Sequence, residues 1–398
     1  MKYILMNAEH EVLEFDVDFK NSAVKVQGKL DGYSFAPIYF DEDSLDRCLS
    51  CLINSRILQM NRRDAGSIIG ALKANNAFEL SFRSLGLSLT DCYWYKPVGS
   101  SLKWEDVNCF ERDYDKSLGE AILKCDYETL AKADLLVPDL TLGGITKKAW
   151  VNVGGKLMLL KSEAGESPFV ERSELLSARL AERLLDENDR LTYTREDFCG
   201  ESYIACEGMI KDHEELIPAG QMIEMLGCCE YNSLKMISKD RQMLERFTET
   251  VRALGVEDID AYLAKIAAAF NLTLAGDCHT SNFGFIRDLK TMKLRAAPLY
   301  DRGRSFGCFG QPTDNGQLSA ASVAVKDPKS VFLIVLFNST VMNSSWDYSW
   351  FSPSRLDGFH EEIEQMLKGF PESPDKYIEL LKAAYDYQLS YICSAAGK

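Results

Sequence analysis

The fold class is indicated most strongly by the stretch Ala275-Gly276-Asp277-Cys278-His279-Thr280-Ser281-Asn282. It places a carboxylate, Asp277, and an amide, Asn282, five positions apart, which is the spacing of base and metal ligand in the loops of phosphoryl-transfer sites. Because Asp and Asn are each about one residue in twenty, such a pair occurs about once by chance in a chain of 398 residues. The neighbouring sequence must therefore decide what the pair means.

The sequence on both sides of this stretch predicts a helix, a loop and a hairpin. Apolar residues between Ile259 and Phe270 recur at helical spacing and end just before the stretch. Two strand-like segments with a polar turn between them follow from Phe283 to Ala297, and the second runs into Pro298-Leu299-Tyr300-Asp301. We expect this hairpin to return Asp301 to a position beside Asn282.

These three polar side chains have the chemistry that phosphoryl transfer requires. The site must hold magnesium on hard oxygen ligands, neutralise the phosphates and orient the acceptor hydroxyl. Asn282 and Asp301 suit the metal, and Asp277 suits the acceptor. The alternative for each is that it satisfies backbone groups in a turn, a common task for Asp and Asn.

An upstream segment supplies candidates for binding a nucleotide. Gly143-Gly144 precedes two strand-like runs joined by Gly154-Gly155, and Lys161 ends the second run beside apolar residues. An ammonium group there is unfavourable unless it meets anions, such as a phosphate and a carboxylate. The carboxylate candidate is Glu174, in the helix expected after Pro168, with Glu171 as the alternative.

Each of these residues also has an ordinary interpretation. Glycine pairs form simple turns, a lysine can lie at the surface with its apolar stem covered, and a helical glutamate can be solvated. The glycine pair, lysine, glutamate, Asp-x4-Asn and a late Asp nevertheless follow one another in the order found in kinases.

With these residues in place, the sequence resembles the HipA-type Ser/Thr kinases over roughly residues 135 to 310. The stretches that carry the resemblance are Ala275 to Phe283, Ala297-Pro298-Leu299-Tyr300-Asp301, Gly143-Gly144-Ile145-Thr146-Lys147-Lys148, Leu159-Leu160-Lys161, and Glu174 in a helix continuing Ala178-Arg179-Leu180-Ala181. The resemblance implies an enzyme that binds ATP and Mg²⁺ and phosphorylates a Ser or Thr of a protein. It also makes an antitoxin-type protein a candidate partner.

The resemblance further implies a role for each site residue. Asp277 would be the catalytic aspartate, with His279 supporting it, and Asn282 and Asp301 would bind magnesium. The nucleotide phosphates would be contacted by Gly143, Gly144 and Lys161, with Glu174 beside Lys161. The adenine hinge would be formed by Glu207 and Met209. Thr141 occupies the position of a serine whose phosphorylation can shut such enzymes off, so it is a candidate autophosphorylation site. For Thr141 the alternative is a threonine that ends a loop.

The expected architecture is α+β, with a protein-kinase-like bilobal fold preceded by an N-terminal α/β region. We expect an accessory region at 1–112, a small β-rich lobe with the glycine loop at 113–206 and a larger helical lobe at 207–398. In the accessory region, strands are expected at Tyr3–Met6, Ala23–Val26 and Ser34–Tyr39, and helices near 44–58 and 65–75. Later helices are expected near 328–343, 356–369 and 374–393.

Composition limits the partners. A formal charge of -15 and a pI near 4.9 give a surface that repels phosphate backbones, so no direct nucleic-acid binding is expected, although a basic protein partner remains compatible. The longest apolar run, Val331 to Phe337, is far shorter than the roughly 20 residues of a membrane helix. We expect a cytoplasmic protein with no membrane contact and with reduced thiols.

Two other functions stay open at this stage. Related folds that phosphorylate small molecules also use a compact Asp-x4-Asn loop, and the acceptor is not visible in the sequence. A non-catalytic nucleotide-binding module is the third hypothesis, against which the intact Lys161, Asp277, Asn282 and Asp301 count.

Overall fold

The computed structural model describes residues 1–60, 62, 64–111, 117–142, 147–161, 168–275, 278–301, 305–306, 340–368 and 375–398, with the backbone alone at 168–170 and 376–377. The chain divides into two compact units. Unit 1 contains Met1–Ala164, Arg195–Ile217 and Ile286–Lys293, and unit 2 contains Gly165–Thr194, Pro218–Phe285 and Leu294–Lys398.

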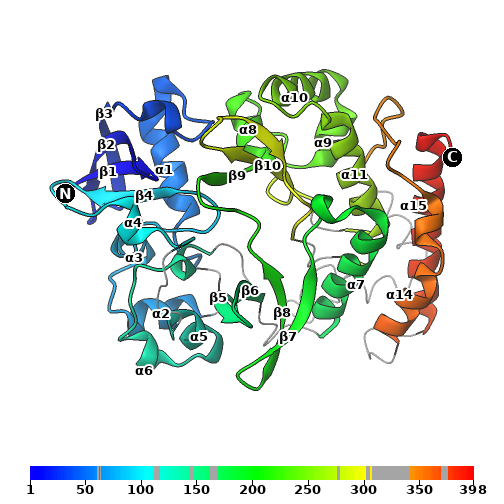
Figure 1. Cartoon of the computed structure of the whole chain (residues 1–398), viewed down its shortest axis with the longest axis horizontal. Helices are drawn as coiled ribbons and strands as arrows, with labels where there is room; N and C mark the ends of the chain where they lie inside the picture. Colours follow the sequence, from blue (N-terminus) through cyan, green and yellow to red (C-terminus); the bar gives the residue numbers. More distant parts are fainter. Residues whose placement is uncertain are drawn as a thin grey trace. The chain divides into compact units, whose positions relative to one another are not determined.

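The elements follow one another in a mixed order of strands and helices (Figure 1). The strands are β1 (Lys2–Asn7), β2 (His10–Asp18), β3 (Ala23–Lys29), β4 (Tyr93–Pro97), β5 (Lys148–Val153), β6 (Lys156–Lys161), β7 (Tyr193–Phe198), β8 (Glu201–Glu207), β9 (Glu214–Pro218), β10 (Gly284–Asp288) and β11 (Leu294–Ala296). The helices are α1 (Leu45–Ser55), α2 (Ala65–Ala71), α3 (Ala77–Arg83), α4 (Trp104–Val107), α5 (Ser117–Lys124), α6 (Tyr127–Leu130), α7 (Pro168–Leu184), α8 (Ala219–Met225), α9 (Leu234–Lys239), α10 (Arg241–Ala253), α11 (Ile259–Leu272), α14 (Phe359–Leu367) and α15 (Asp375–Ala396). Short 3-10 helices are η1 (Tyr33–Phe35), η2 (Glu42–Ser44), η3 (Pro138–Thr141), η4 (Glu187–Asp189) and η5 (Pro353–Leu356).

The first four strands form an antiparallel sheet in the order β3-β2-β1-β4 (Figure 1). Leu5 of β1 lies opposite Leu13 of β2 on one side and Tyr95 of β4 on the other. Alternation along β2 buries Leu13, Phe15 and Val17 on one face, as expected for a sheet with one covered side. Apolar side chains of α1 and α3 pack on that face and complete a hydrophobic cluster.

The predictions for this region are partly wrong. Segments Tyr3–Met6 and Ala23–Val26 are confirmed as parts of β1 and β3, and the helices near 44–58 and 65–75 as α1 and α2. The strand expected at Ser34–Tyr39 is wrong, because this segment begins in η1, where Ala36 N–H donates to the Tyr33 carbonyl, and continues into Pro37, which has no N–H for a ladder.

A second sheet, in the order β5-β6-β8-β7, contains the predicted glycine hairpin. Val153 and Lys156 pair across Gly154 and Gly155, whose φ angles are +59° and +84°. Two successive positive φ values are typical of the tight hairpin turn that glycine forms without strain. Strand β6 then pairs antiparallel with β8, so that Lys161 lies opposite Ile204.

Within unit 1 the N-terminal sheet and the second sheet share one hydrophobic core. The same cluster contains Met6 of β1, Trp94 of β4, Leu118 and Ile122 of α5, and Trp150 of β5. The N-terminal region is therefore packed on the second sheet and not merely tethered to it.

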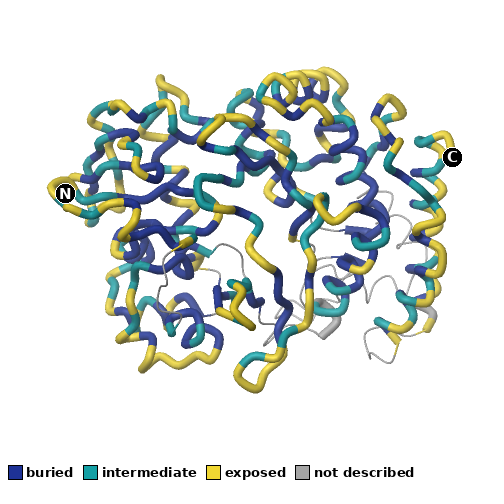
Figure 2. The backbone as a smooth tube through the Cα atoms, viewed as in Figure 1, coloured by how far each residue is buried: buried dark blue, intermediate teal, exposed yellow. Residues whose placement is uncertain are grey.

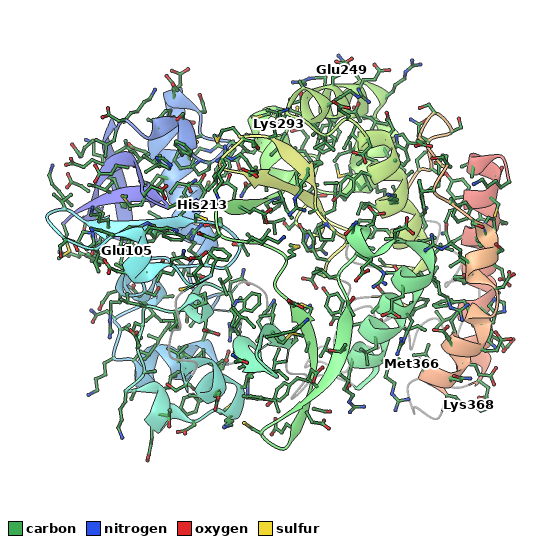
Figure 3. The ribbon with its side chains drawn as sticks, viewed as in Figure 1. Glu105, His213, Glu249, Lys293, Met366 and Lys368 are labelled. Carbon is green, nitrogen blue, oxygen red and sulfur yellow. The ribbon has the colours of Figure 1, made fainter. Side chains whose placement is uncertain are left out.

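Unit 2 is mainly helical and is built around α11. All residues of this helix except Asp260 and Lys265 are buried (Figure 2), which is the expected state of a helix that is apolar on every side. Elsewhere in the unit, Arg172 of α7 donates to the carbonyl of Met366 at 2.9 Å. Met366 lies on α14 (Figure 3), and α14 packs against α15 (Figure 1).

The later predicted helices have different outcomes. Those near 356–369 and 374–393 are confirmed as α14 and α15. The one near 328–343 falls largely outside the described residues, and its described part, 340–343, is not helical.

A third sheet, in the order β11-β10-β9, contains the predicted hairpin after Asn282. Its strands β9 and β10 each cross from one unit into the other along the chain. Among the described helices, none has an apolar stretch long enough to cross a membrane. Every described cysteine is a thiol.

Candidate functional site

Most of the predicted site residues are described by the structure. Gly143, Gly144 and Asp277 lie outside the described residues. Position 277 immediately precedes the described loop that begins at Cys278 and contains Asn282.

The backbone of this loop is held from two sides within unit 2. At the start of α8, the N–H groups of Ala219 and Gly220 donate to the carbonyls of Phe283 and Thr280 at 2.9 and 3.1 Å. On the other side, Thr280 N–H donates to the carbonyl of Asn232 at 2.9 Å. Gly220 permits the approach, since a Cβ there would lie 3.0 Å from Thr280 Oγ1.

Asn282 is buried at the end of the loop, with 5% of its surface exposed. Its N–H donates to the carbonyl of His279 at 3.0 Å and closes a tight turn. The next strand is fixed by Tyr262 of α11, whose hydroxyl accepts from Gly284 N–H at 3.0 Å and donates to the Gly284 carbonyl at 2.7 Å. Ala297 N–H also donates to the Gly284 carbonyl at 3.0 Å, so the hairpin closes as predicted.

Asp301 is exposed and adopts a left-handed backbone conformation, with φ of +46°. Its N–H donates to the hydroxyl of Tyr193 at 3.0 Å. Two residues earlier, Leu299 N–H donates to the Asp189 carbonyl at 2.8 Å, and the Leu299 carbonyl accepts from Leu191 N–H at 3.1 Å. Aspartate is one of the few residues besides glycine that tolerate this conformation, and pairing with the neighbouring segment holds it there.

Tyr300 joins the two segments. Its hydroxyl donates to the carbonyl of Ser281 at 2.9 Å, which links the residue before Asn282 to the residue before Asp301. Burial raises the pKa of Tyr300 well above its usual value, and the hydroxyl therefore stays protonated as a donor at neutral pH. The fold thus brings together the two segments that carry the predicted magnesium ligands.

The donor set fits magnesium better than a transition metal. Among the residues that the structure describes, no group of three or more His, Cys, Asp or Glu side chains is placed to hold a metal ion. Magnesium, however, is usually bound by one or two protein oxygen ligands together with substrate phosphates and water. The Asn282 amide and the Asp301 carboxylate supply hard oxygen atoms of that kind.

Comparison with known proteins bears on the fold. No protein-family model and no curated protein matches the sequence. Among solved structures, the chain is similar to the HipA toxin of Shewanella oneidensis MR-1, solved with HipB and its operator DNA. The TM-score is 0.52 and the identity 13%, over 100% of this chain and 99% of that one.

The chain has a HipA-like fold. It is also similar to CtkA, a proinflammatory kinase of Helicobacter pylori, with 12% identity over 64% of this chain and 91% of that one. The TM-score for this second likeness is 0.43.

In this HipA-like fold the two predicted partners Lys161 and Glu174 are both buried, at 9% and 3% exposure. Lys161 ends β6 in unit 1, whereas Glu174 lies on α7 in unit 2. Beside Glu174, the Ser173 hydroxyl accepts from Ser305 N–H at 3.2 Å, which ties α7 to the chain just beyond Asp301. The alternative carboxylate, Glu171, is only half-buried.

The other residues that the sequence predicts for the site lie partly at the surface and partly in the interior. Glu207 ends β8 with an exposed side chain that pairs with Lys156 at 2.9 Å, and Met209 is half-buried. His279 is exposed and accepts at Nδ1 from Ser281 N–H at 3.3 Å. Thr141 is buried, and its hydroxyl lies 2.6 Å from the carbonyl of Leu87.

Two residues of the site were not predicted from the sequence, Tyr193 and Tyr262. The side-chain hydroxyl of each forms a hydrogen bond with the backbone of a residue distant in the sequence. Tyr193 contacts Asp301, and Tyr262 contacts Gly284. No local pattern marks them, since buried tyrosines are common in cores.

Proposed function

We propose that this chain is an ATP- and magnesium-dependent phosphotransferase that phosphorylates a Ser or Thr of a protein. The observation that supports it most is the Tyr300 bond to Ser281, which brings the Asn282 loop and the Asp301 segment together in a HipA-like fold. In this proposal the small lobe lies at 113–206 and the helical lobe at 207–398, preceded by the accessory region at 1–112.

The proposed roles follow the order of the residues in the chain. Gly143, Gly144 and Lys161 bind the nucleotide phosphates, with Glu174 as the carboxylate beside Lys161. Glu207 and Met209 border the adenine through the backbone after β8. Asp277 orients the acceptor hydroxyl and accepts its proton, and His279 supports the same loop.

Asn282 and Asp301 would hold the magnesium. When bound, the ion neutralises charge that develops on the transferred phosphoryl group and its leaving group. The protein's own contribution is to fix these two oxygen ligands before the nucleotide arrives, which reduces the ordering required on binding.

Autophosphorylation at Thr141 would require a local opening. Its hydroxyl is buried and lies 2.6 Å from the carbonyl of Leu87 and 3.0 Å from the carbonyl of Pro138. A buried hydroxyl with both carbonyls beside it is closed to a phosphate donor, so in this proposal η3 moves before Thr141 accepts phosphate.

An antitoxin-type protein is the proposed partner. The similar Shewanella toxin was solved with HipB and operator DNA. The charge of -15 on the present chain favours a basic protein partner and disfavours direct contact with a phosphate backbone.

Incubation with labelled ATP, magnesium and a mixture of cellular proteins tests the proposed function. We expect phosphoserine or phosphothreonine to form with the wild-type chain and to fall by at least a hundredfold with Asp277→Asn, because the acceptor loses its base. The matched control is Asp260→Asn, at a partly exposed carboxylate that pairs with Arg252, and it should act as the wild type. Equal labelling by Asp277→Asn, or no phosphoserine or phosphothreonine with the wild-type chain, would contradict the proposal.

A further inference from the structure

Both proposed magnesium ligands follow a peptide bond that contacts a tyrosine hydroxyl. Tyr300 Oη donates to the carbonyl of Ser281, directly before Asn282, and Tyr193 Oη accepts from the N–H of Asp301. The proposed chemistry assigns no task to either hydroxyl. Their positions at the two ligand-bearing segments call for a physical explanation.

The peptide unit between Ser281 and Asn282 is fixed at both ends. Its carbonyl accepts from Tyr300 at 2.9 Å, and its N–H donates to the His279 carbonyl at 3.0 Å. Because a peptide unit is planar, two such bonds on opposite sides determine its orientation. The orientation of this plane, together with the φ angle of Asn282, sets the direction in which the Asn282 side chain leaves the backbone.

The peptide unit between Tyr300 and Asp301 is fixed in a related way. Its N–H donates to Tyr193 at 3.0 Å, and Asp301 adopts φ of +46°. A non-glycine residue in this region stores a modest strain, so surrounding contacts must hold it there. The Tyr193 hydroxyl is one such contact. It holds the N–H of Asp301, and rotation about the N–Cα bond of Asp301 would release the strain.

We infer that Tyr300 and Tyr193 are positioning residues that orient Asn282 and Asp301 for the metal before ATP binds. This inference rests on the proposed function and extends it to two residues whose hydroxyls contact the backbone of the ligand-bearing segments. Tyr300 acts on the amide ligand and Tyr193 on the carboxylate ligand. Their phenol rings supply packing as well, which a phenylalanine would keep.

The test uses Tyr300→Phe and Tyr193→Phe in the full chain, with Tyr348→Phe as the matched control. Tyr348 is also buried in unit 2, and its hydroxyl also donates to a backbone carbonyl at 2.9 Å, that of Asn343. We measure ATP binding as a function of magnesium concentration. Hydrogen exchange of peptides covering 278–284 is measured on the same proteins without ligand.

We expect each site variant to need roughly three- to tenfold more magnesium for half-maximal ATP binding, the effect of about one hydrogen bond. Binding should recover at high magnesium, whereas a general loss of folding would lower it at every concentration. Exchange at 278–284 should rise in Tyr300→Phe, and Tyr348→Phe should change neither reading.

Two results would overturn the inference. If exchange rises but the magnesium dependence is unchanged, the hydroxyls only stabilise the loops. If the wild type shows no magnesium-dependent ATP binding, the proposed function itself fails and the positioning role with it. Magnesium-dependent ATP binding by the wild type together with an unshifted magnesium dependence in the variants identifies the first failure, and a wild type without magnesium-dependent binding identifies the second.

Discussion

The carboxylate of Glu215 and the guanidinium of Arg287 lie 2.6 Å apart in the interior of unit 1. Arg287 also donates to the Ala36 carbonyl and to the Tyr93 hydroxyl, both at 3.0 Å. On the other side, Asn7 Nδ2 lies 3.3 Å from Glu215 Oε2. This buried network connects the N-terminal sheet to β9 and β10, the strands that lead to α8 and follow the Asn282 loop.

Removal of the buried cation should be costly. Arg287→Met leaves Glu215 in the interior without its ion-pair partner, and we expect a loss of about 3–5 kcal/mol in the free energy of unfolding at pH 8. The loss should be smaller at pH 5, where Glu215 can take up a proton. Urea denaturation at both pH values measures this, with Arg241→Met at a 93% exposed side chain as the control. Equal, small losses in both variants would contradict the account of the network.

Glu215 should also make stability depend on pH. Burial raises its pKa from 4.5 to about 7, although Arg287 opposes the shift. Because the folded state binds this proton more tightly than the unfolded chain, the stabilisation is full below about pH 4.5 and is lost as the pH rises to about 7. We expect Glu215→Gln to remove this slope, which is worth at most about 3 kcal/mol. Parallel pH profiles of the variant and the wild type would exclude Glu215 as its source.

A single glycine tests the packing of the N-terminal sheet. Gly86 has φ of +63°, and a Cβ there would lie 2.4 Å from the Tyr95 ring, which is fully buried. Gly86→Ala should therefore lower the free energy of unfolding by about 2 kcal/mol or more, through overpacking and backbone strain. Thermal unfolding checks this against Gly28→Ala, where the new methyl group meets nothing within 4 Å. Comparable melting temperatures for the two variants would contradict the packing described for Tyr95.

Thr141 should not tolerate a charge in the structure described. Thr141→Glu places a carboxylate in a site with 8% exposure, and we expect a loss of about 2–4 kcal/mol and faster hydrogen exchange across η3. Thr291→Glu, at an exposed turn of the same unit, is the control. A Thr141→Glu protein with wild-type exchange would show that η3 can accept phosphate without opening.

The sequence predicted those parts of the fold that local patterns encode. The hairpin at Gly154-Gly155 follows from two glycines between alternating runs, and α11 follows from apolar spacing between Ile259 and Phe270. The error at Ser34–Tyr39 has a local cause, since Pro37 and the turn before it outweigh a run of strand-forming residues.

The sequence could not supply contacts between distant segments. Asn7, Glu215 and Arg287 come together only through the pairing of strands far apart in the chain, and nothing local to Glu215 indicates its partner. The same holds for Tyr193, whose contact with Asp301 spans 108 positions. Asn282 and Asp301 were predicted as neighbours because only a hairpin separates them, and the Tyr300 bond to Ser281 agrees with that expectation.

Calorimetric titration of ATP into the wild-type chain and into Asp301→Ala, each with and without magnesium, tests the central claim most directly. We predict that the wild type binds ATP at least tenfold more tightly with magnesium than without it, and that Asp301→Ala loses this difference. ATP binding by the wild type that is absent, or that is indifferent to magnesium, would contradict the claim that these two segments form a phosphoryl-transfer site.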